Sequence, residues 1–188
     1  MKINFFFLLI IITSGLLIAQ TSSIKKLKNA ETRMEENCTR DTASSVLIPE
    51  YFPNAIFELQ EDKFTGIETF FLKNDDKIII KNWGCEYYVL TFRMESSKFE
   101  SDTSNLANFG IELNKLFSDI YPGLNAPIDI RNANSKLREH LMNFPDYQLG
   151  DPIYFMDGEI PEFVSLNKIE ELKSGLVVVE VTYSAGPL

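Results

Sequence analysis

Two cysteines, Cys38 and Cys85, carry the most distinctive chemistry of this 188-residue chain. In an oxidising compartment two thiols most often join as a disulfide, which here closes a long loop. The alternative is a catalytic thiol at Cys85, which needs a histidine as general base, and the chain contains only His140. We therefore predict a Cys38–Cys85 disulfide. His140 lies off the apolar stripe of its segment and is interpreted as a solvated surface residue.

Acidic residues near turns offer a second kind of chemistry. The pair Asp75–Asp76 and the trio Asp157, Glu159 and Glu162 have the residue types that hold a cation or form a hydrolytic carboxylate pair. Acids also collect at turns without any catalytic role in a chain that has 27 of them. The sequence lacks calcium-loop spacing, a phosphate-binding glycine loop, a nucleophile elbow and a zinc ligand set. We predict no metal or other cofactor, and a carboxylate-dependent hydrolase acting on cell-wall material stays open as an alternative.

Aromatic side chains gather between Lys77 and Met94, a stretch that holds the only tryptophan, Trp83. After Trp83–Gly84, which either separates two strands or marks a bulge, regular alternation predicts a strand. One face of this strand carries Tyr88, Leu90, Phe92 and Met94, and the other carries Cys85, Tyr87, Val89, Thr91 and Arg93. A face with Tyr, Thr and Arg has the composition of an interface centre rather than a dry core. The predicted binding site comprises Trp83, Tyr87, Thr91 and Arg93, where alanine at Tyr87 or Arg93 should weaken partner binding by more than ~1 kcal/mol each.

The rest of the chain supplies the elements that position this strand. Runs rich in β-branched and aromatic residues at 55–59, 66–72 and 78–80 precede it, and their short connections predict an antiparallel meander. Helical spacing then predicts one helix from Asp102 or Thr103, capped by residues 102–104, to Pro122–Gly123, and a second from Ile130 to Phe144. Strands are again predicted at 153–156, at 163–172, where a short helix is the alternative, and at 175–183.

These elements predict an α+β domain over residues 54–188. Its mainly antiparallel sheet has five to seven strands, and two consecutive helices pack on one face. Residues 20–53 are predicted to form an N-terminal leader and an extended arm, because Pro49 and Pro53 push the residues before them out of the helical region. The disulfide would tie this arm to the sheet at Cys85.

The first residues have the pattern of a secretory signal peptide. Lys2 precedes an apolar segment, Phe5–Ile18, which leads to Ala19, so residues 1–19 are predicted to be cleaved off. The alternative is an uncleaved anchor, but the apolar segment is shorter than the ~20 residues of a spanning helix. No stable membrane anchor is expected after cleavage, and the mature protein is expected to be periplasmic or secreted.

The chain is acidic, with a formal net charge of −9 that becomes −10 when residues 1–19, which hold one lysine and no acid, are removed. Nucleic acids and anionic lipids require a positive surface and are therefore disfavoured as partners. Export, a stapled domain and the lack of a catalytic set in the sequence favour a non-enzymatic binding module of the cell envelope. We rank a protein-binding inhibitor or immunity-type partner first and a small-ligand carrier second; an accessory subunit of an envelope complex is a further alternative.

Overall fold

The computed structural model describes residues 38, 41–100, 102, 105–156 and 158–187. The chain divides into two compact units, Met1–Cys38 and Thr39–Leu188, and the fold below is that of the second unit. The predicted signal peptide (1–19) and the leader segment 20–37 lie outside the described residues. The predicted arm is described from Asp41 onwards.

The described residues form seven strands and two α-helices. The strands are β1 (Ile56–Leu59), β2 (Gly66–Phe71), β3 (Lys77–Trp83), β4 (Tyr88–Ser96), β5 (Ile153–Met156), β6 (Glu162–Glu171) and β7 (Val177–Ala185). The helices are α2 (Leu106–Ile120) and α3 (Ile130–Asn143), with a short 3-10 helix, η1 (Tyr121–Gly123), directly after α2. In the part of the chain that the structure describes, neither helix has the length and apolar character needed to cross a membrane.

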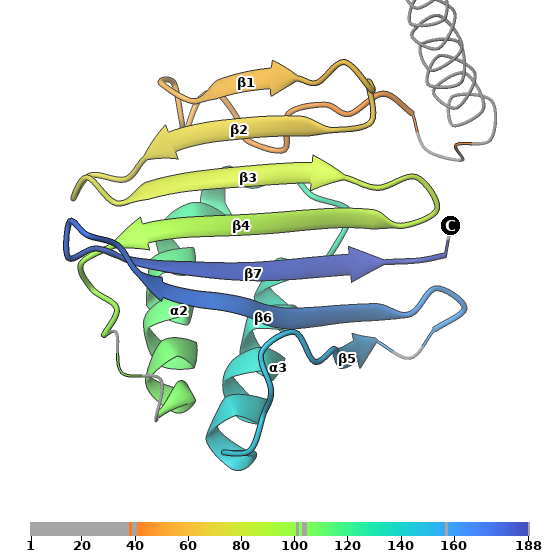
Figure 1. The fold of residues 1–188 in the computed structure, drawn as a ribbon. Coiled ribbons are helices and arrows are strands. Elements are labelled where there is room, and N and C mark those ends of the chain that lie inside the picture. Colours follow the sequence, from red (N-terminus) through yellow and green to blue (C-terminus); the bar gives the residue numbers. More distant parts are fainter. Residues whose placement is uncertain (1–37, 39–40, 101, 103–104, 157, 188) are drawn as a thin grey trace, which may run out of the picture. The chain divides into compact units, whose positions relative to one another are not determined.

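All seven strands belong to one antiparallel sheet in the order β1-β2-β3-β4-β7-β6-β5 (Figure 1). The first four strands form the predicted meander, because their connections are too short for anything but antiparallel neighbours. The last strand returns to the middle of the sheet, where β7 pairs with β4 from Tyr88↔Ala185 to Ser96↔Val177. The predicted α+β class is confirmed, with a strand count at the upper end of the expected range.

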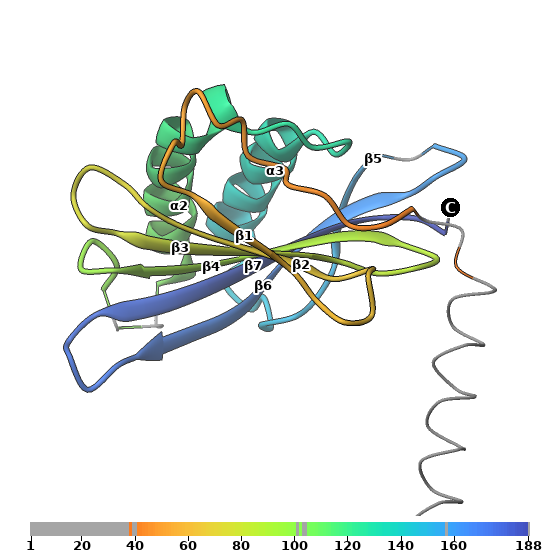
Figure 2. The ribbon, with the colours of Figure 1, turned by 90° about the horizontal axis from the view of Figure 1, so that it is seen from above.

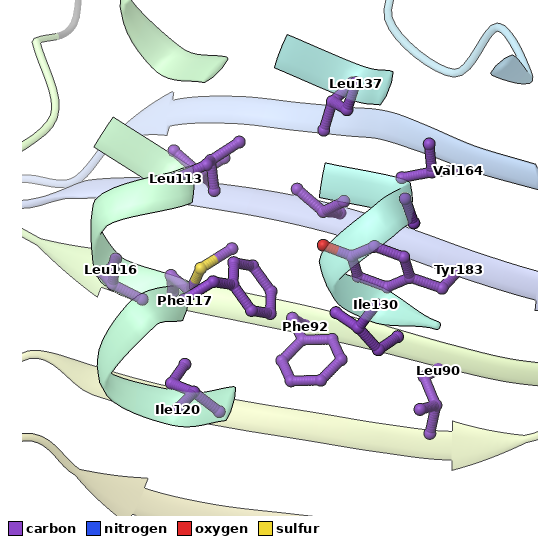
Figure 3. Packing of buried hydrophobic residues seen from close by; sticks show 14 of the residues in the cluster. Leu90, Phe92, Leu113, Leu116, Phe117, Ile120, Ile130, Leu137, Val164 and Tyr183 are labelled. Atoms are coloured by element: carbon purple, nitrogen blue, oxygen red, sulfur yellow. The ribbon is translucent and has the colours of Figure 1, made fainter. Parts of the chain in front are cut away.

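Both helices pack on the same face of the sheet, as predicted (Figure 2). The buried hydrophobic side chains of α2 and α3 recur at helical spacing and are Phe109, Leu113, Leu116, Phe117 and Ile120 in the first helix and Ile130, Ala133, Leu137 and Leu141 in the second. Phe92 of β4 lies beneath them, with its ring centroid 4.9 Å from that of Phe117 and 5.5 Å from that of Tyr183 (Figure 3). Fully burying a side chain of this size stabilises the fold by about 1.5–3 kcal/mol.

The two faces of β4 are divided as the sequence predicted. Leu90, Phe92 and Met94 are fully buried under the helices. Thr91 and Arg93 are partly exposed on the opposite face. Alternation in the sequence therefore identified the core-facing side correctly.

The prediction that Cys85 and Tyr87 belong to this strand is wrong. β3 ends at Trp83 and β4 begins at Tyr88, so both residues lie in the hairpin connection. Gly84 has a φ of +104°, and a Cβ atom there would lie 2.2 Å from the carbonyl oxygen of Tyr87. The chain turns sharply at this glycine, in a conformation that other residues rarely adopt.

The segment that was ambiguous between strand and helix is strand β6, and a bulge explains the ambiguity. Leu166 pairs with Val181 and Ile169 pairs with Val179, so both face the core although they are three residues apart. The register shifts between Leu166 and Lys168, where one extra residue is inserted. The bulge gives a strand the apolar spacing of a helix.

Helix α2 begins later than predicted. Its N-cap is Asn105, which makes no side-chain capping hydrogen bond, so the predicted cap within residues 102–104 is wrong. The helix starts where its apolar stripe starts, at Leu106, because packing rather than capping stabilises it. Helix α3 begins where predicted, and the side chain of Asp129 accepts a hydrogen bond from the Asn132 N–H at 3.0 Å.

The arm packs against the fold on the helix side of the sheet (Figure 2). Ala43, Val46 and Leu47 are buried, and Leu47 forms an isolated β-bridge with Leu124 after η1. Apart from this bridge, the described arm residues form turns and irregular backbone.

Candidate functional site

The sheet face opposite the helices, which we call the open face, carries most of the predicted site. Among the described residues, neither α2 nor α3 packs on it (Figure 2). The Trp83 indole Nε1–H donates a hydrogen bond to Thr91 Oγ1 at 3.2 Å, and the hydroxyl oxygens of Thr91 and Thr182 lie 3.0 Å apart. Arg93 lies two residues further along β4 on the same face, opposite Glu180. The structure therefore brings Trp83, Thr91 and Arg93 together on one surface.

Arg93 is held by two glutamates rather than presented as a free cation. Its Nε lies 3.1 Å from Glu95 Oε1 and its Nη1 lies 3.0 Å from Glu180 Oε1. Partial burial lowers the pKa of Arg93, but the hydrogen bonds that its guanidinium donates to Glu180 and Glu95 outweigh this effect and raise it. Lys77 Nζ, 4.0 Å from Glu95, completes a group of two cations and two anions. This part of the open face is polar but locally neutral.

Tyr87 does not join the other three predicted residues on the strands. It lies in the β3–β4 connection with 38% of its surface exposed. Its ring packs on Gly186, where a Cβ atom would lie only 2.7 Å from Tyr87 Cδ1. Tyr87 is therefore a residue of the hairpin end of the sheet.

Large apolar side chains are exposed on the open face around the polar group. They are Ile56 in β1, Phe71 in β2, Trp83 in β3 and Tyr154 in β5. Phe71 is 62% exposed and Trp83 is 37% exposed. The Lys81 Nζ lies 4.7 Å from the centroid of the Trp83 ring, a cation–π distance that keeps the indole in place over the sheet. Exposed aromatics around satisfied polar groups are typical of protein-binding surfaces.

The acidic pair Asp75–Asp76 is a structural feature of the β2–β3 turn. Asp76 is almost fully buried, accepts a hydrogen bond from Asn74 and forms an ion pair with Lys98 Nζ at 3.0 Å. Burial raises the pKa of Asp76, but hydrogen bonds from Ser96 and Asn74 outweigh burial and hold it below the usual value. Its carboxylate is therefore committed to the fold.

Of the three acidic residues Asp157, Glu159 and Glu162, the two that the structure describes differ in exposure. Asp157 lies outside the described residues, Glu159 is exposed, and Glu162 is partly buried at the start of β6. Glu162 Oε2 is a buried oxygen without a hydrogen-bond partner among the described residues. Burial, together with the negative charge of Asp129, raises the pKa of Glu162. In the part of the chain that the structure describes, no group of three or more His, Cys, Asp or Glu residues could hold a metal ion.

His140 is part of an aromatic contact on α3. Its ring stacks on Phe144 with centroids 4.4 Å apart and meets the edge of Tyr147 at 5.7 Å. The side chain is half-buried by these contacts, so the histidine predicted at the surface is only partly solvated. The apolar stripe alone could not show this, because both ring partners lie beyond the end of the helix.

A chain of hydrogen bonds lies under the helices. The Tyr183 hydroxyl donates to Asn134 Oδ1 at 2.6 Å, and Asn134 Nδ2 donates to the Tyr121 hydroxyl oxygen at 2.9 Å. Burial raises the pKa of Tyr183 well above its usual value of 10.0. The network satisfies polar groups that would otherwise be costly in a core.

A polar cleft of about 460 Å³ lies on the helix side of the sheet and was not predicted. Its walls are the arm and the segment between η1 and α3, and its floor is the end of β3 and the start of β4. The side chains that give it its chemistry are Asp41, Thr42, Ser44, Asn82, Tyr88 and Asn125. Its volume is within the range of small-molecule sites.

Four contacts hold the arm in place beside the cleft. The Glu68 carboxylate accepts hydrogen bonds from the N–H groups of Val46, at 2.7 Å, and Leu47, at 3.2 Å. Asn125 N–H donates to the carbonyl oxygen of Val46 at 2.7 Å, and Asn82 Nδ2 donates to that of Ser44 at 2.9 Å. These contacts fix the backbone that forms this wall of the cleft.

Cys38 and Cys85 form the predicted disulfide. No cysteine of the described residues is a free thiol, so a nucleophilic role for Cys85 is not supported. The bond joins the chain three residues before Asp41 to the β3–β4 connection.

No protein-family model matches the chain, and no curated protein or solved structure is significantly similar to it. The function must therefore be argued from the two surfaces described above.

Proposed function

We propose that this protein is an exported, non-enzymatic binding module of the cell envelope, periplasmic or secreted, that binds another protein through its open face. Within that class an inhibitor or immunity-type partner fits best. The disulfide supports the compartment, since such bonds persist mainly outside the cytosol.

The observation that carries the proposal is the composition of the open face. Trp83 and Phe71 are exposed there beside hydrogen-bonded polar groups, and both are large enough to fill a pocket on a partner. A sheet face used only for solvation would instead carry mainly polar side chains at its exposed positions.

The charges of the open face indicate the chemistry of the partner surface. Arg93 and Lys77 lie within 4.0 Å of Glu95, and Lys168 Nζ lies 2.6 Å from Glu170 Oε2. Because these charges neutralise one another, the matching surface is expected to be apolar at its centre rather than strongly basic. Binding should then depend only weakly on salt.

The test is affinity capture from envelope extract with wild-type protein and three single variants. Phe71→Glu and Trp83→Ala should each lose the partner. Met142→Glu, at a 58% exposed position of α3 on the helix side, is the matched control and should retain it. Capture should persist at 0.5 M salt. A partner retained equally by all variants, or the lack of any partner specific to the wild type, would refute the proposal.

A carboxylate-dependent hydrolase is the second candidate, and Glu162 is the observation that favours it. A carboxyl group with a raised pKa beside another acid is the usual arrangement of a general acid. Purified protein should then release reducing ends from cell-wall glycan, and Glu162→Gln should abolish this release while the circular dichroism spectrum stays unchanged. Wild-type protein without hydrolytic activity would eliminate this candidate.

A further inference from the structure

The polar cleft is separate from the open face, because it lies on the other side of the sheet. Asn82 and Tyr88, which form its floor, lie on the same side of the sheet as the core residue Leu90. Trp83 and Thr91 lie on the opposite side. A ligand in the cleft therefore does not compete with a partner on the open face.

The residues around the cleft determine which ligands fit. None of the described residues that line the cleft is a lysine, arginine or histidine, so an anion would find no cationic partner among them. One carboxylate, Asp41, lies at its edge, and a single carboxylate is too little for a stable divalent cation site. The remaining groups are hydroxyls and amides, which both donate and accept hydrogen bonds.

Tyr88 adds an aromatic surface to this polar set. It is half-buried, and part of its side chain packs against the core while part lines the cleft. An aromatic ring with hydroxyl and amide groups around it suits a ligand that has an apolar face and many hydroxyl groups on its rim.

The way the arm is held supports a role in binding. Residues 41–45 (DTASS) contribute no large apolar side chain to the core, yet the buried Glu68 carboxylate fixes the backbone directly after them. Burying a carboxylate is costly, and the buried side chains of Ala43, Val46 and Leu47 already attach the arm by apolar contacts. The hydrogen bonds of Glu68 and Asn82 therefore add a fixed backbone beneath the polar residues 41–45, which reduces the entropy lost when a ligand binds.

We propose that this cleft binds a neutral saccharide unit. The ring of Tyr88 would lie against an apolar face of the sugar. The side chains of Asp41, Thr42 and Asn125 would exchange hydrogen bonds with its hydroxyl groups.

The test is a two-dimensional amide NMR titration of the disulfide-bonded protein. The probes are soluble neutral monosaccharides and neutral oligosaccharides, tested separately, because a preference for length distinguishes a free sugar from a glycan chain. At least one probe should shift the amides of Ser44 and Asn125 and leave those of Thr91 and Arg93 unchanged. If no neutral probe shifts these amides even at the highest concentration that dissolves, the proposal is overturned. Binding of charged saccharides alone would also overturn it.

Two variants localise the site. The double variant Thr42→Val/Asn125→Ala should weaken binding at least tenfold, and Ser44→Trp should fill the cleft and abolish it. Asn143→Ala, at an exposed asparagine at the end of α3, is the matched control and should bind like the wild type. Unchanged affinity in a folded double variant would place the sugar elsewhere. Because these residues lie outside the open face, loss of sugar binding and loss of protein binding can be distinguished.

Discussion

The carboxylate of Glu68 in β2 accepts the backbone N–H of Val46 in the arm at 2.7 Å, across 22 residues of sequence. Glu68 is only 1% exposed, and it also accepts hydrogen bonds from the Ser45 hydroxyl at 2.6 Å and the Leu47 N–H at 3.2 Å. Hydrogen bonds to a charged group contribute about 1.5–3 kcal/mol each, which offsets the cost of burying the carboxylate. One side chain of β2 thus accepts three hydrogen bonds from the arm, in addition to those that Asn82 and Asn125 make with it.

Glu68→Gln should weaken the attachment of the arm. The amide has only one acceptor oxygen, so the hydrogen bond to at least one of the Val46 and Leu47 N–H groups is lost; the Leu47 N–H keeps Ser45 Oγ as an acceptor at 3.2 Å. We expect the free energy of unfolding in urea to fall by about 1–3 kcal/mol and the hydrogen exchange of these two amides to accelerate. Glu58→Gln, at an exposed position of the neighbouring strand, should change stability by less than about 0.5 kcal/mol. Equal effects of the two substitutions would contradict this role.

Much of the fold could be predicted from the sequence because its signals are local. Alternation and composition identify strands such as β7, and helical spacing identifies α3, without knowledge of their neighbours. The errors arise where contacts between distant parts of the chain determine where a strand or helix begins or ends. Gly84 turns the chain so that Cys85 leaves the predicted strand, and packing sets the start of α2 at Leu106.

The candidate surfaces were predicted less completely, for the same reason. Alternation placed Thr91 and Arg93 on one face, but their partners Thr182 and Glu180 lie about ninety residues away and depend on the β4–β7 register. The cleft combines the arm, β3, β4 and the segment before α3, and no single stretch of sequence marks it.

Removal of the disulfide should destabilise the protein. Cys38→Ser and Cys85→Ser should each lower the free energy of unfolding by about 2–4 kcal/mol, because the closed loop restricts the unfolded chain. The double variant should have the same free energy of unfolding as each single variant, because the same disulfide is lost in all three. Thiol labelling of native, unreduced wild-type protein should give no signal. Stoichiometric labelling of Cys85 would contradict the bond.

The hydrogen bond between Asn134 and Tyr183 predicts that substitutions at these two positions, which are far apart in the sequence, have coupled effects on stability. Tyr183→Phe leaves Asn134 Oδ1 without its donor, and Asn134→Leu leaves the Tyr183 hydroxyl buried without an acceptor. Each should cost about 1–3 kcal/mol in urea unfolding. The double variant should cost less than the sum, because neither substitution then leaves a buried group of this pair unpaired. Additive costs would show that the pair does not interact in solution.

Glu162 predicts how stability changes with pH. Burial, followed by the charge of Asp129, raises the pKa of Glu162 above its usual value of 4.5 in the folded protein. The native state therefore binds this proton more tightly than the unfolded chain does. The stability that protonated Glu162 contributes is fully present below pH 4.5. It is lost as the pH rises through the higher pKa of Glu162 in the folded state. Above that pKa the ionised, partly buried carboxylate destabilises the fold.

Glu162→Gln should consequently raise the free energy of unfolding at pH 7, by an amount on the order of 1 kcal/mol, because it removes a charge whose buried oxygen has no partner among the described residues. The gain should disappear below pH 4, where the wild-type carboxyl is also neutral. Urea unfolding of both proteins between pH 3.5 and pH 8 measures this difference directly. Glu159→Gln, three residues earlier and exposed, is the matched control and should show no such pH dependence. A gain that is constant across this range would mean that the effect comes from packing rather than from the charge of Glu162.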